Sequence, residues 1–367
     1  MRRPAVAGTP VVVKVGSSSL AHPDGGLNAD AVRAVVDQVE QLTALDHPPV
    51  LVTSGAVAAG LPALGLAARP KDLPGLQAAA AVGQGRLMER YASEFGRLGR
   101  LVGQVLLTRD VLAHRGQYLH AREALERLLA LGVVPIVNEN DTVVVDELRL
   151  GDNDRLAAIV SHLVGAGMLV ILTDTTGLYS DDPRLADDAE LLSAVRHTDE
   201  ILDALWQRST AGALGSGGVA TKVSAARMAA WSGIPTVIAD ASNPSAVATA
   251  VVGDDVGTWV EPHKARLTAR KLWIAFGLPS QGKLVVDAGA ARALLGRGGS
   301  LLAAGILVVE GGFGAGAAVE VVGPSNKFIG KGLVGLPAED LRAALGQHST
   351  VTGGAVVHRD DLVVLAR

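Results

Sequence analysis

The feature that most constrains the fold is a series of short apolar runs separated by segments with helical spacing. The runs lie at residues 11–15, 50–53, 101–107, 133–137, 169–172 and 236–239. The intervening helical segments include residues 29–45, 76–98, 119–131 and 222–231. Strands that are apolar along their whole length are buried on both faces, as in parallel sheets covered by helices. The pattern therefore predicts an α/β fold with three αβα layers around a mainly parallel sheet.

Polar residues follow the carboxyl ends of four of these runs. They are Lys14 to Ser18, Ser54-Gly55, Asn138 to Asp141 and Thr173-Asp174. In open α/β sheets the ligand crevice lies outside the carboxyl ends of the strands. We therefore expect these four segments to contribute to one ligand site.

A glycine-rich segment, GSGGVATK at residues 215–222, runs into the predicted helix that follows Lys222. Glycines let backbone N–H groups approach phosphate oxygens, and lysines compensate the charge of a transferring phosphoryl group. Lys14 supplies a second lysine at a Gly/Ser loop. The GxxxxGK[ST] pattern is not met, because no glycine directly precedes Lys222. The segment alone would be an ordinary loop, but with Lys14 it favours phosphoryl transfer.

Residues 151–154, GDND, place two carboxylates and one amide before a predicted helix. A helix cap uses one such residue, so three of them favour a functional role. We assign a substrate contact to Asn153 and the orientation of both lysines to Asp154. Carboxylates repel phosphates unless a cation lies between them, which indicates Mg²⁺. The sequence assigns no residue as its ligand.

Two further patterns point away from other chemistries. Residues 277–283 spell GxxxxGK, but Leu284 stands where a hydroxyl residue is needed and a strand follows, so we interpret the segment as a turn. The nine histidines show no metal-ligand spacing, and no Gly-x-Ser-x-Gly elbow supports serine hydrolysis.

The long polar loop at residues 173–183 is typical of a functional loop and would suit nucleoside contacts.

Composition narrows the class of protein further. The absence of cysteine excludes disulfides, thiolate nucleophiles and cysteine-ligated metals. The net charge of −4 shows no excess of basic residues of the kind that marks a protein binding nucleic acid or membrane surfaces. Lys14 interrupts the first apolar stretch, so no signal peptide is expected. The run 156–172 contains His162 and two glycines and is interpreted as a helix, a turn and a strand. We expect a soluble cytoplasmic protein that does not enter a membrane.

The strand–helix alternation ends near residues 254–275, where a basic cluster appears. Beyond it, short strands and glycine-rich turns predict a small β-rich domain. We expect a first domain at residues 1–260, a linker at 261–277 and a second domain at 278–367.

The ordered segments VVVKVGSSSL, LVTSGAVAAG, PIVNENDTVV, GDND, TDTTGLYSDDPR and GSGGVATKVSAA resemble the amino acid kinase family. The later segments GKLVVDAGAARAL and VEGGF resemble a PUA domain, a small β-barrel module. The resemblance covers essentially the whole chain and points to the two-domain members that phosphorylate glutamate. One departure is Ser17, where the family pattern has threonine, and this conservative change alters little.

The resemblance implies ATP-dependent phosphorylation of the γ-carboxylate of L-glutamate to L-glutamate 5-phosphate, the first step of proline biosynthesis. Lys14 and Lys222 would flank the moving phosphoryl group, and Asp154 would organise both lysines. The implied glutamate-binding residues are Ser54, Asp141 and Asn153. The implied ATP-binding residues are Lys14, Thr173, Asp174, Ser216, Gly217, Gly218, Val219, Ala220, Thr221 and Lys222. Mg²⁺, feedback inhibition by proline and assembly into homodimers or homotetramers are further expectations from the family.

Two alternatives stay open. A sister activity would use N-acetylglutamate, aspartate or a nucleoside monophosphate as acceptor, with the same phosphate-binding parts. An RNA-binding regulator would act through the PUA-like domain. Residues 278–356 hold six Lys/Arg and five Asp/Glu, which is less basic than surfaces that track phosphates, so we expect no RNA binding.

Overall fold

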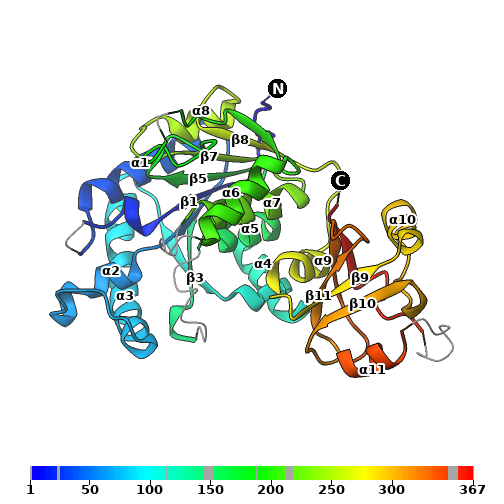
Figure 1. Ribbon diagram of the computed structural model, residues 1–367. Helices are drawn as coiled ribbons and strands as arrows, with labels where there is room; N and C mark the ends of the chain where they lie inside the picture. The colour runs from blue at the N-terminus through cyan, green and yellow to red at the C-terminus, as the bar shows by residue number, and fades with distance from the viewer. Residues whose placement is uncertain are drawn as a thin grey trace. The chain divides into compact units, whose positions relative to one another are not determined.

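The computed structural model describes residues 2–22, 25–112, 114–143, 153–186, 188–211, 218–345 and 354–366. The chain forms two compact units, Met1–Arg266 and Leu267–Arg367 (Figure 1).

The first unit alternates strands and helices. Its strands are β1 (Val11–Val15), β2 (Pro49–Thr53), β3 (Val102–Leu107), β4 (Val134–Glu139), β5 (Met168–Thr173), β6 (Ala194–Arg196), β7 (Thr236–Asp240) and β8 (Thr258–Glu261). Its α-helices are α1 (Ala29–Ala44), α2 (Ala56–Gly60), α3 (Leu73–Arg97), α4 (Arg115–Ala130), α5 (Asn153–Leu163), α6 (Glu200–Ala211), α7 (Val219–Trp231) and α8 (Ala246–Val252). Its short 3-10 turns are η1 (Ser17–Ser19), η2 (Pro62–Leu64), η3 (Arg109–Leu112) and η4 (Asp141–Val143).

The strands of this unit form one eight-stranded sheet in the order β3-β4-β2-β1-β5-β7-β8-β6. All neighbours up to β7 pair in parallel, whereas β8 runs antiparallel to β7 and carries β6 parallel to itself. The prediction of a mainly parallel sheet is confirmed. Two short strands were not predicted from the sequence: β6, at the edge of the sheet, and β8, between β6 and β7.

Helices cover both faces of this sheet, as Figure 1 shows. On one face, Val11, Val13 and Val15 share a core with apolar residues of α1, α3 and α8. In α1 the buried apolar residues recur every three or four positions, which is the apolar stripe that docks a helix on a sheet. On the other face, α5 lies against β1, β2, β4 and β5, and α7 lies against β7 and β8. The three αβα layers are therefore present.

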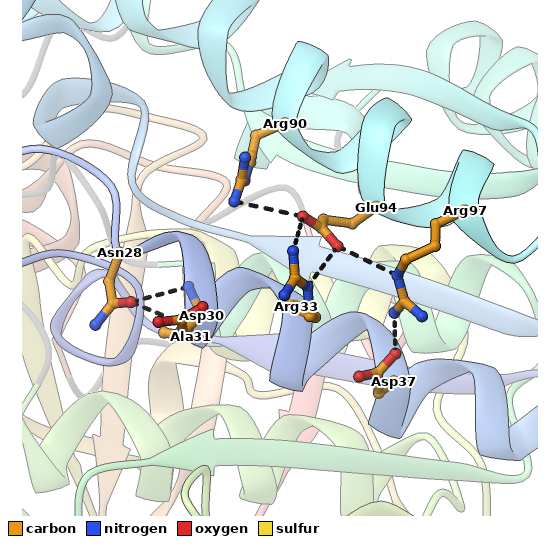
Figure 2. A network of polar contacts seen from close by, with 8 residues as sticks. All are labelled: Asn28, Asp30, Ala31, Arg33, Asp37, Arg90, Glu94 and Arg97. Carbon is orange, nitrogen blue, oxygen red and sulfur yellow. Dashed lines mark hydrogen bonds and ion pairs between the residues drawn. The ribbon is translucent and has the colours of Figure 1, made fainter.

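Helix α3 is tied to α1 by an arginine–glutamate network (Figure 2). The buried Glu94 carboxylate accepts from Arg33 of α1 at 3.1 Å and lies 3.4 Å from Arg90 and 3.5 Å from Arg97. Arg97 in turn pairs with Asp37 of α1. The arginines lower the pKa of Glu94, hydrogen bonding from Arg33 being the largest contribution. The network holds in place the helix from which several side chains reach the site described below.

The loop after β2 is shaped by glycines. Gly55 has a φ of 106°, a left-handed conformation that suits glycine. Helices α2 and α3 approach so closely that a Cβ at Gly83 would overlap the carbonyl oxygen of Ala56. This close contact fixes α2, and with it Ser54 at the carboxyl end of β2.

The second unit is β-rich, as expected. Its strands are β9 (Gly282–Val286), β10 (Ile306–Gly311), β11 (Ala318–Val322), β12 (Phe328–Leu333) and β13 (Leu362–Val364). Its helices are α9 (Ala269–Leu272), the π-helix η6 (Trp273–Gly277), α10 (Ala288–Arg297), the 3-10 turn η7 (Ala303–Gly305) and α11 (Ala338–Ala343). The sheet order is β10-β9-β11-β12-β13, with β9 and β11 parallel and the other neighbours antiparallel.

The residues that the sequence analysis treated as a linker are structured. Glu261 ends β8, and residues 269–277 form α9 and η6 within the second unit. Ile274 is fully buried and packs with Val363 of β13. The physical reason is that this segment carries several apolar side chains, and their burial under the second sheet lowers the free energy of the folded chain. The segment 277–283 leads into β9 rather than a helix, as expected of a turn.

Among the described helices, none combines the length and the apolar character that crossing a membrane requires.

Candidate active site

Three charged side chains meet beside the carboxyl end of β1. The Nζ atom of Lys14 lies 2.5 Å from Oδ1 of Asp154, and Nζ of Lys222 lies 3.6 Å from Oδ2 of the same carboxylate. The exposed fractions of these side chains are 4%, 2% and 11% for Lys14, Asp154 and Lys222. We call them the lysine–aspartate cluster. The structure thus brings together the three residues that the sequence proposed for catalysis.

Each member of the cluster comes from a different element. Lys14 lies on β1 between its neighbours Val52 of β2 and Ile171 of β5. Asp154 lies in the first turn of α5, where the positive end of the helix dipole favours a carboxylate. Lys222 lies in the first turns of α7, and α7 packs against α5. The packing of these helices therefore sets the distances within the cluster.

A hydroxyl group completes the contacts of Asp154. Oγ1 of Thr221 donates a hydrogen bond of 2.7 Å to Oδ2 of Asp154. The sequence analysis placed Thr221 in the ATP-binding loop and did not anticipate this contact. Its position one residue before Lys222 couples the glycine-rich segment directly to the carboxylate.

The charges shift the proton affinities of the cluster. Burial by itself would raise the pKa of Asp154, but the positive charges of Lys14 and Lys222 outweigh it and lower that pKa. Burial lowers the pKa of Lys222, and the charge of Asp154 partly opposes this. Asp154 is therefore ionised at neutral pH. Two ammonium groups share one carboxylate, so an excess of positive charge is available to an anionic ligand.

A group of buried polar side chains lies next to the cluster, around Asn153. The Nδ2 atom of Asn153 donates to the Thr53 carbonyl oxygen at 2.7 Å, to Oδ1 of Asn138 at 2.8 Å and to Oγ of Ser54 at 3.0 Å. These contacts join the ends of β2 and β4 to the start of α5. The predicted substrate residues Ser54 and Asn153 are thus in direct contact. Asp141 is buried in η4, three residues beyond Asn138.

The predicted nucleotide-binding residues that the structure describes, apart from Lys14, lie at the end of β5 and at the start of α7. Thr173 is the last residue of β5 and donates a 3.1 Å hydrogen bond to Oδ1 of Asp174. Asp174 is exposed. Its negative charge acts to raise the pKa of Lys222, against the larger lowering that burial causes. Gly218 is the N-cap of α7, and Val219, Ala220 and Thr221 form the start of that helix. Ser216 and Gly217, as well as Gly151 and Asp152, lie outside the described residues.

The sequence analysis missed several residues of this site. Asn138 lay in the segment 138–141, which was expected to contribute to the ligand site, but it was not among the residues assigned to a substrate. Gln84 and Tyr91 of α3 reach Asn138 and Thr53, respectively, by hydrogen bonds of 2.8 and 2.7 Å. Helical spacing marks Tyr91 only as a buried position and does not mark Gln84, and no local pattern in α3 indicates the hydrogen-bond partner of either residue.

The described part of the chain contains no group of three or more His, Asp or Glu side chains able to hold a metal ion by themselves. Asp154 is engaged by two lysines and a hydroxyl group. A metal ion at this site would therefore take most of its ligands from a bound nucleotide and from water.

Comparison with known sequences agrees with this arrangement. The amino acid kinase family matches residues 9–240, which is more than half of the chain. The chain belongs to the amino acid kinase family. The members of this family are phosphotransferases. The matched residues include every strand from β1 to β7 and all three residues of the lysine–aspartate cluster. A PUA domain matches residues 282–352.

Several relatives match this chain over almost its full length. A glutamate 5-kinase of Frankia casuarinae is 48% identical over 97% of this chain and 96% of its own length. One from Streptomyces coelicolor is 46% identical with the same coverage, and one from Geobacter sulfurreducens is 44% identical over 97% of both chains. The chain is therefore similar to these enzymes from end to end.

Proposed function

We propose that this protein transfers the γ-phosphoryl group of ATP to the γ-carboxylate of L-glutamate, the first step of proline biosynthesis. The observation that supports this most strongly is the buried lysine–aspartate cluster at the carboxyl edge of a parallel sheet. Full-length similarity to glutamate 5-kinases supports glutamate as the acceptor.

The chemistry requires positioning and charge compensation more than proton transfer. The γ-carboxylate is ionised and nucleophilic at neutral pH, so it attacks the γ-phosphorus in line without a general base. The obstacle is the approach of an anion to a polyanion. Lys14 and Lys222 would flank the transferring group, and Asp154 would hold both ammonium groups in place. Because the cluster is buried, its charges act through a medium that screens them less than water does.

Both substrates would lie near this cluster. Ser54, Asp141 and Asn153 would bind glutamate. ATP would contact Thr173, Asp174 and the segment 216–222, where the backbone N–H groups at the start of α7 point toward phosphate oxygens. The dipole of α7 adds to the charge of Lys222 at its first turns.

An ATP-dependent kinase of this family implies a metal ion, and we propose Mg²⁺. When bound with ATP, Mg²⁺ neutralises phosphate charge and orients the triphosphate. The carboxylates of the described residues would add at most a few ligands, as argued above. Lys14, Lys222 and the helix start of α7 perform the rest of the charge compensation.

Other properties follow from the proposed activity. We expect the protein to act in the cytoplasm, to be inhibited by proline and to form homodimers or homotetramers. We expect its PUA domain not to bind RNA. Activity against a proline titration, light scattering and RNA binding at varied salt test the last three expectations separately.

The decisive experiment traps the acyl phosphate with hydroxylamine. The purified protein is incubated with ATP, Mg²⁺ and L-glutamate, with N-acetylglutamate and aspartate in parallel. Hydroxamate from glutamate alone supports the proposal. Product only from another acceptor would assign a sister activity with that carboxylate. No hydroxamate from any of the three would reject a carboxylate kinase and leave a nucleoside monophosphate kinase or a binding protein as the alternatives.

A further inference from the structure

Four amide side chains form a one-way chain of hydrogen bonds that ends at the proposed glutamate site. Nδ2 of Asn153 donates to Oδ1 of Asn138 at 2.8 Å, and Nδ2 of Asn138 donates to Oε1 of Gln84 at 2.8 Å. Nε2 of Gln84 then donates to Oε1 of Gln104 at 3.4 Å. This series of hydrogen bonds runs from α5 through β4 and α3 to β3. At each step the amide nitrogen of one residue donates to the amide oxygen of the next.

Backbone groups fix the orientation of the two buried amides. The Thr53 carbonyl can only accept, so it requires the nitrogen of Asn153 on its side. The N–H of Glu139 can only donate, and it donates to Oδ1 of Asn138 at 2.9 Å. The hydroxyl of Tyr91, 2.7 Å from Oγ1 of Thr53, helps to hold the residue whose carbonyl sets this orientation. The oxygen of Asn153 therefore lies on the side of the amide that faces away from the Thr53 carbonyl.

The oxygen of Asn153 is the one buried end of this hydrogen-bonded series that lacks a partner among the described residues. Oδ1 of Asn153 is buried and has no hydrogen-bond partner among the described residues, and the residue is 2% exposed. A buried acceptor without a donor is unfavourable, so the site is built to receive one from a ligand. Donation from its own nitrogen makes an amide oxygen a stronger acceptor, and hydrogen-bonded amides polarise one another. Such an oxygen suits a cationic donor.

We propose that Gln84 is a positioning residue that holds Asn138 and Asn153 so that Oδ1 of Asn153 accepts a hydrogen bond from the ammonium group of the amino-acid substrate. The inference rests on the proposed function, which supplies an acceptor with a free ammonium group. Without the Gln84 oxygen, Nδ2 of the buried Asn138 loses its acceptor. Asn138 is then held at its oxygen alone, by the N–H of Glu139, and tilts about that bond. Its oxygen no longer holds Asn153 at the angle that aims Oδ1 at the ligand.

The test compares variants of Gln84 on two ligands. Gln84→Met removes the acceptor at similar length, Gln84→Asn withdraws the amide by one methylene, and Gln84→Glu keeps an acceptor oxygen at the same place. Gln104→Met is the matched control, since it breaks only the long outer link of the chain. Glutarate, which has two carboxylates and no ammonium group, is measured as an inhibitor competing with glutamate in the hydroxamate assay.

We expect Gln84→Met and Gln84→Asn to raise the KM for glutamate about tenfold, the effect of losing one hydrogen bond to a charged group. The KM for ATP, kcat and the melting temperature should stay close to their original values. Inhibition by glutarate should change by less than about twofold, because glutarate makes no ammonium contact. Gln84→Glu and Gln104→Met should keep the KM for glutamate within about threefold.

Each contrary result has a clear meaning. Equal weakening of glutamate and glutarate, or a Gln84→Glu variant as poor as Gln84→Met, would show a merely structural role and overturn the inference. An unchanged KM in both Gln84→Met and Gln84→Asn would overturn it as well. These results leave the proposed function intact if the unaltered protein makes hydroxamate from glutamate, whereas failure of the unaltered protein would reject both.

Discussion

Replacing Asp154 with asparagine tests the charge balance of the lysine–aspartate cluster directly. The substitution keeps the shape of the side chain but leaves Lys14 and Lys222 buried without the carboxylate that they share. At an effective dielectric constant of about 20, the gross attraction is about 7 kcal/mol for the 2.5 Å pair and about 5 kcal/mol for the 3.6 Å pair. Desolvation offsets much of this, so we expect a loss of about 3–5 kcal/mol in the free energy of unfolding.

The same reasoning predicts an opposite effect on ATP binding. The triphosphate brings negative charge to the two lysines, so Asp154→Asn should bind ATP more tightly than the unaltered protein. By linkage, saturating ATP with Mg²⁺ should then recover part of the lost stability. Turnover should nevertheless fall by about 10²–10³, because the lysines are no longer held at the transferring group.

Urea unfolding with and without ATP, together with calorimetric titration of ATP, measures both effects. Asp203→Asn is a suitable control, since it makes the same change at an exposed carboxylate paired with Arg227, where little change is expected. The reasoning would be refuted if Asp154→Asn unfolded at the same urea concentration as the unaltered protein and bound ATP no more tightly.

Three further predictions concern other parts of the first unit. Lys222→Ala should lower kcat by about 10²–10³ and change the KM for glutamate far less, and near-normal turnover would remove this lysine from the mechanism. Burial, with smaller contributions from nearby arginines, lowers the pKa of His162 from 6.5 to about 4. The unfolded chain then binds a proton that the folded chain does not, so stability is lost as the pH falls from 6.5 to about 4. Urea unfolding of His162→Gln should therefore depend less on pH than that of the unaltered protein, and an unchanged pH dependence would contradict this. Gly83→Ala should destabilise by about 1–3 kcal/mol and raise the KM for glutamate, because its Cβ would overlap the backbone of α2. Gly85→Ala on the same helix meets open space and should stabilise by about 0.5–1 kcal/mol, so equal thermal unfolding of the two variants would argue against the close contact.

Much of the fold of the first unit could be predicted because its signals are local. The predicted strand at residues 11–15 coincides with β1, and the predicted helix at residues 29–45 differs from α1 by one residue. Uniformly apolar runs can be satisfied only by a sheet covered on both faces, and α1 and α5 provide that cover. The second unit was predicted less completely, since the burial of Ile274 depends on β13, which lies some ninety residues further along the chain.

The sequence by itself determined which chemistry is available: a lysine at the end of a buried strand, a carboxylate before a helix and a glycine-rich segment that carries a second lysine. These features follow from the order of residue types, because parallel strands bring their carboxyl ends to one edge. Only the tertiary structure decided how the groups meet. The contact of Asn153 with Thr53 spans 100 residues, and that of Asn138 with Gln84 spans 54. The orientation of an amide depends on which partners surround it in space, and the packing of α3, α5 and α7 supplies those partners.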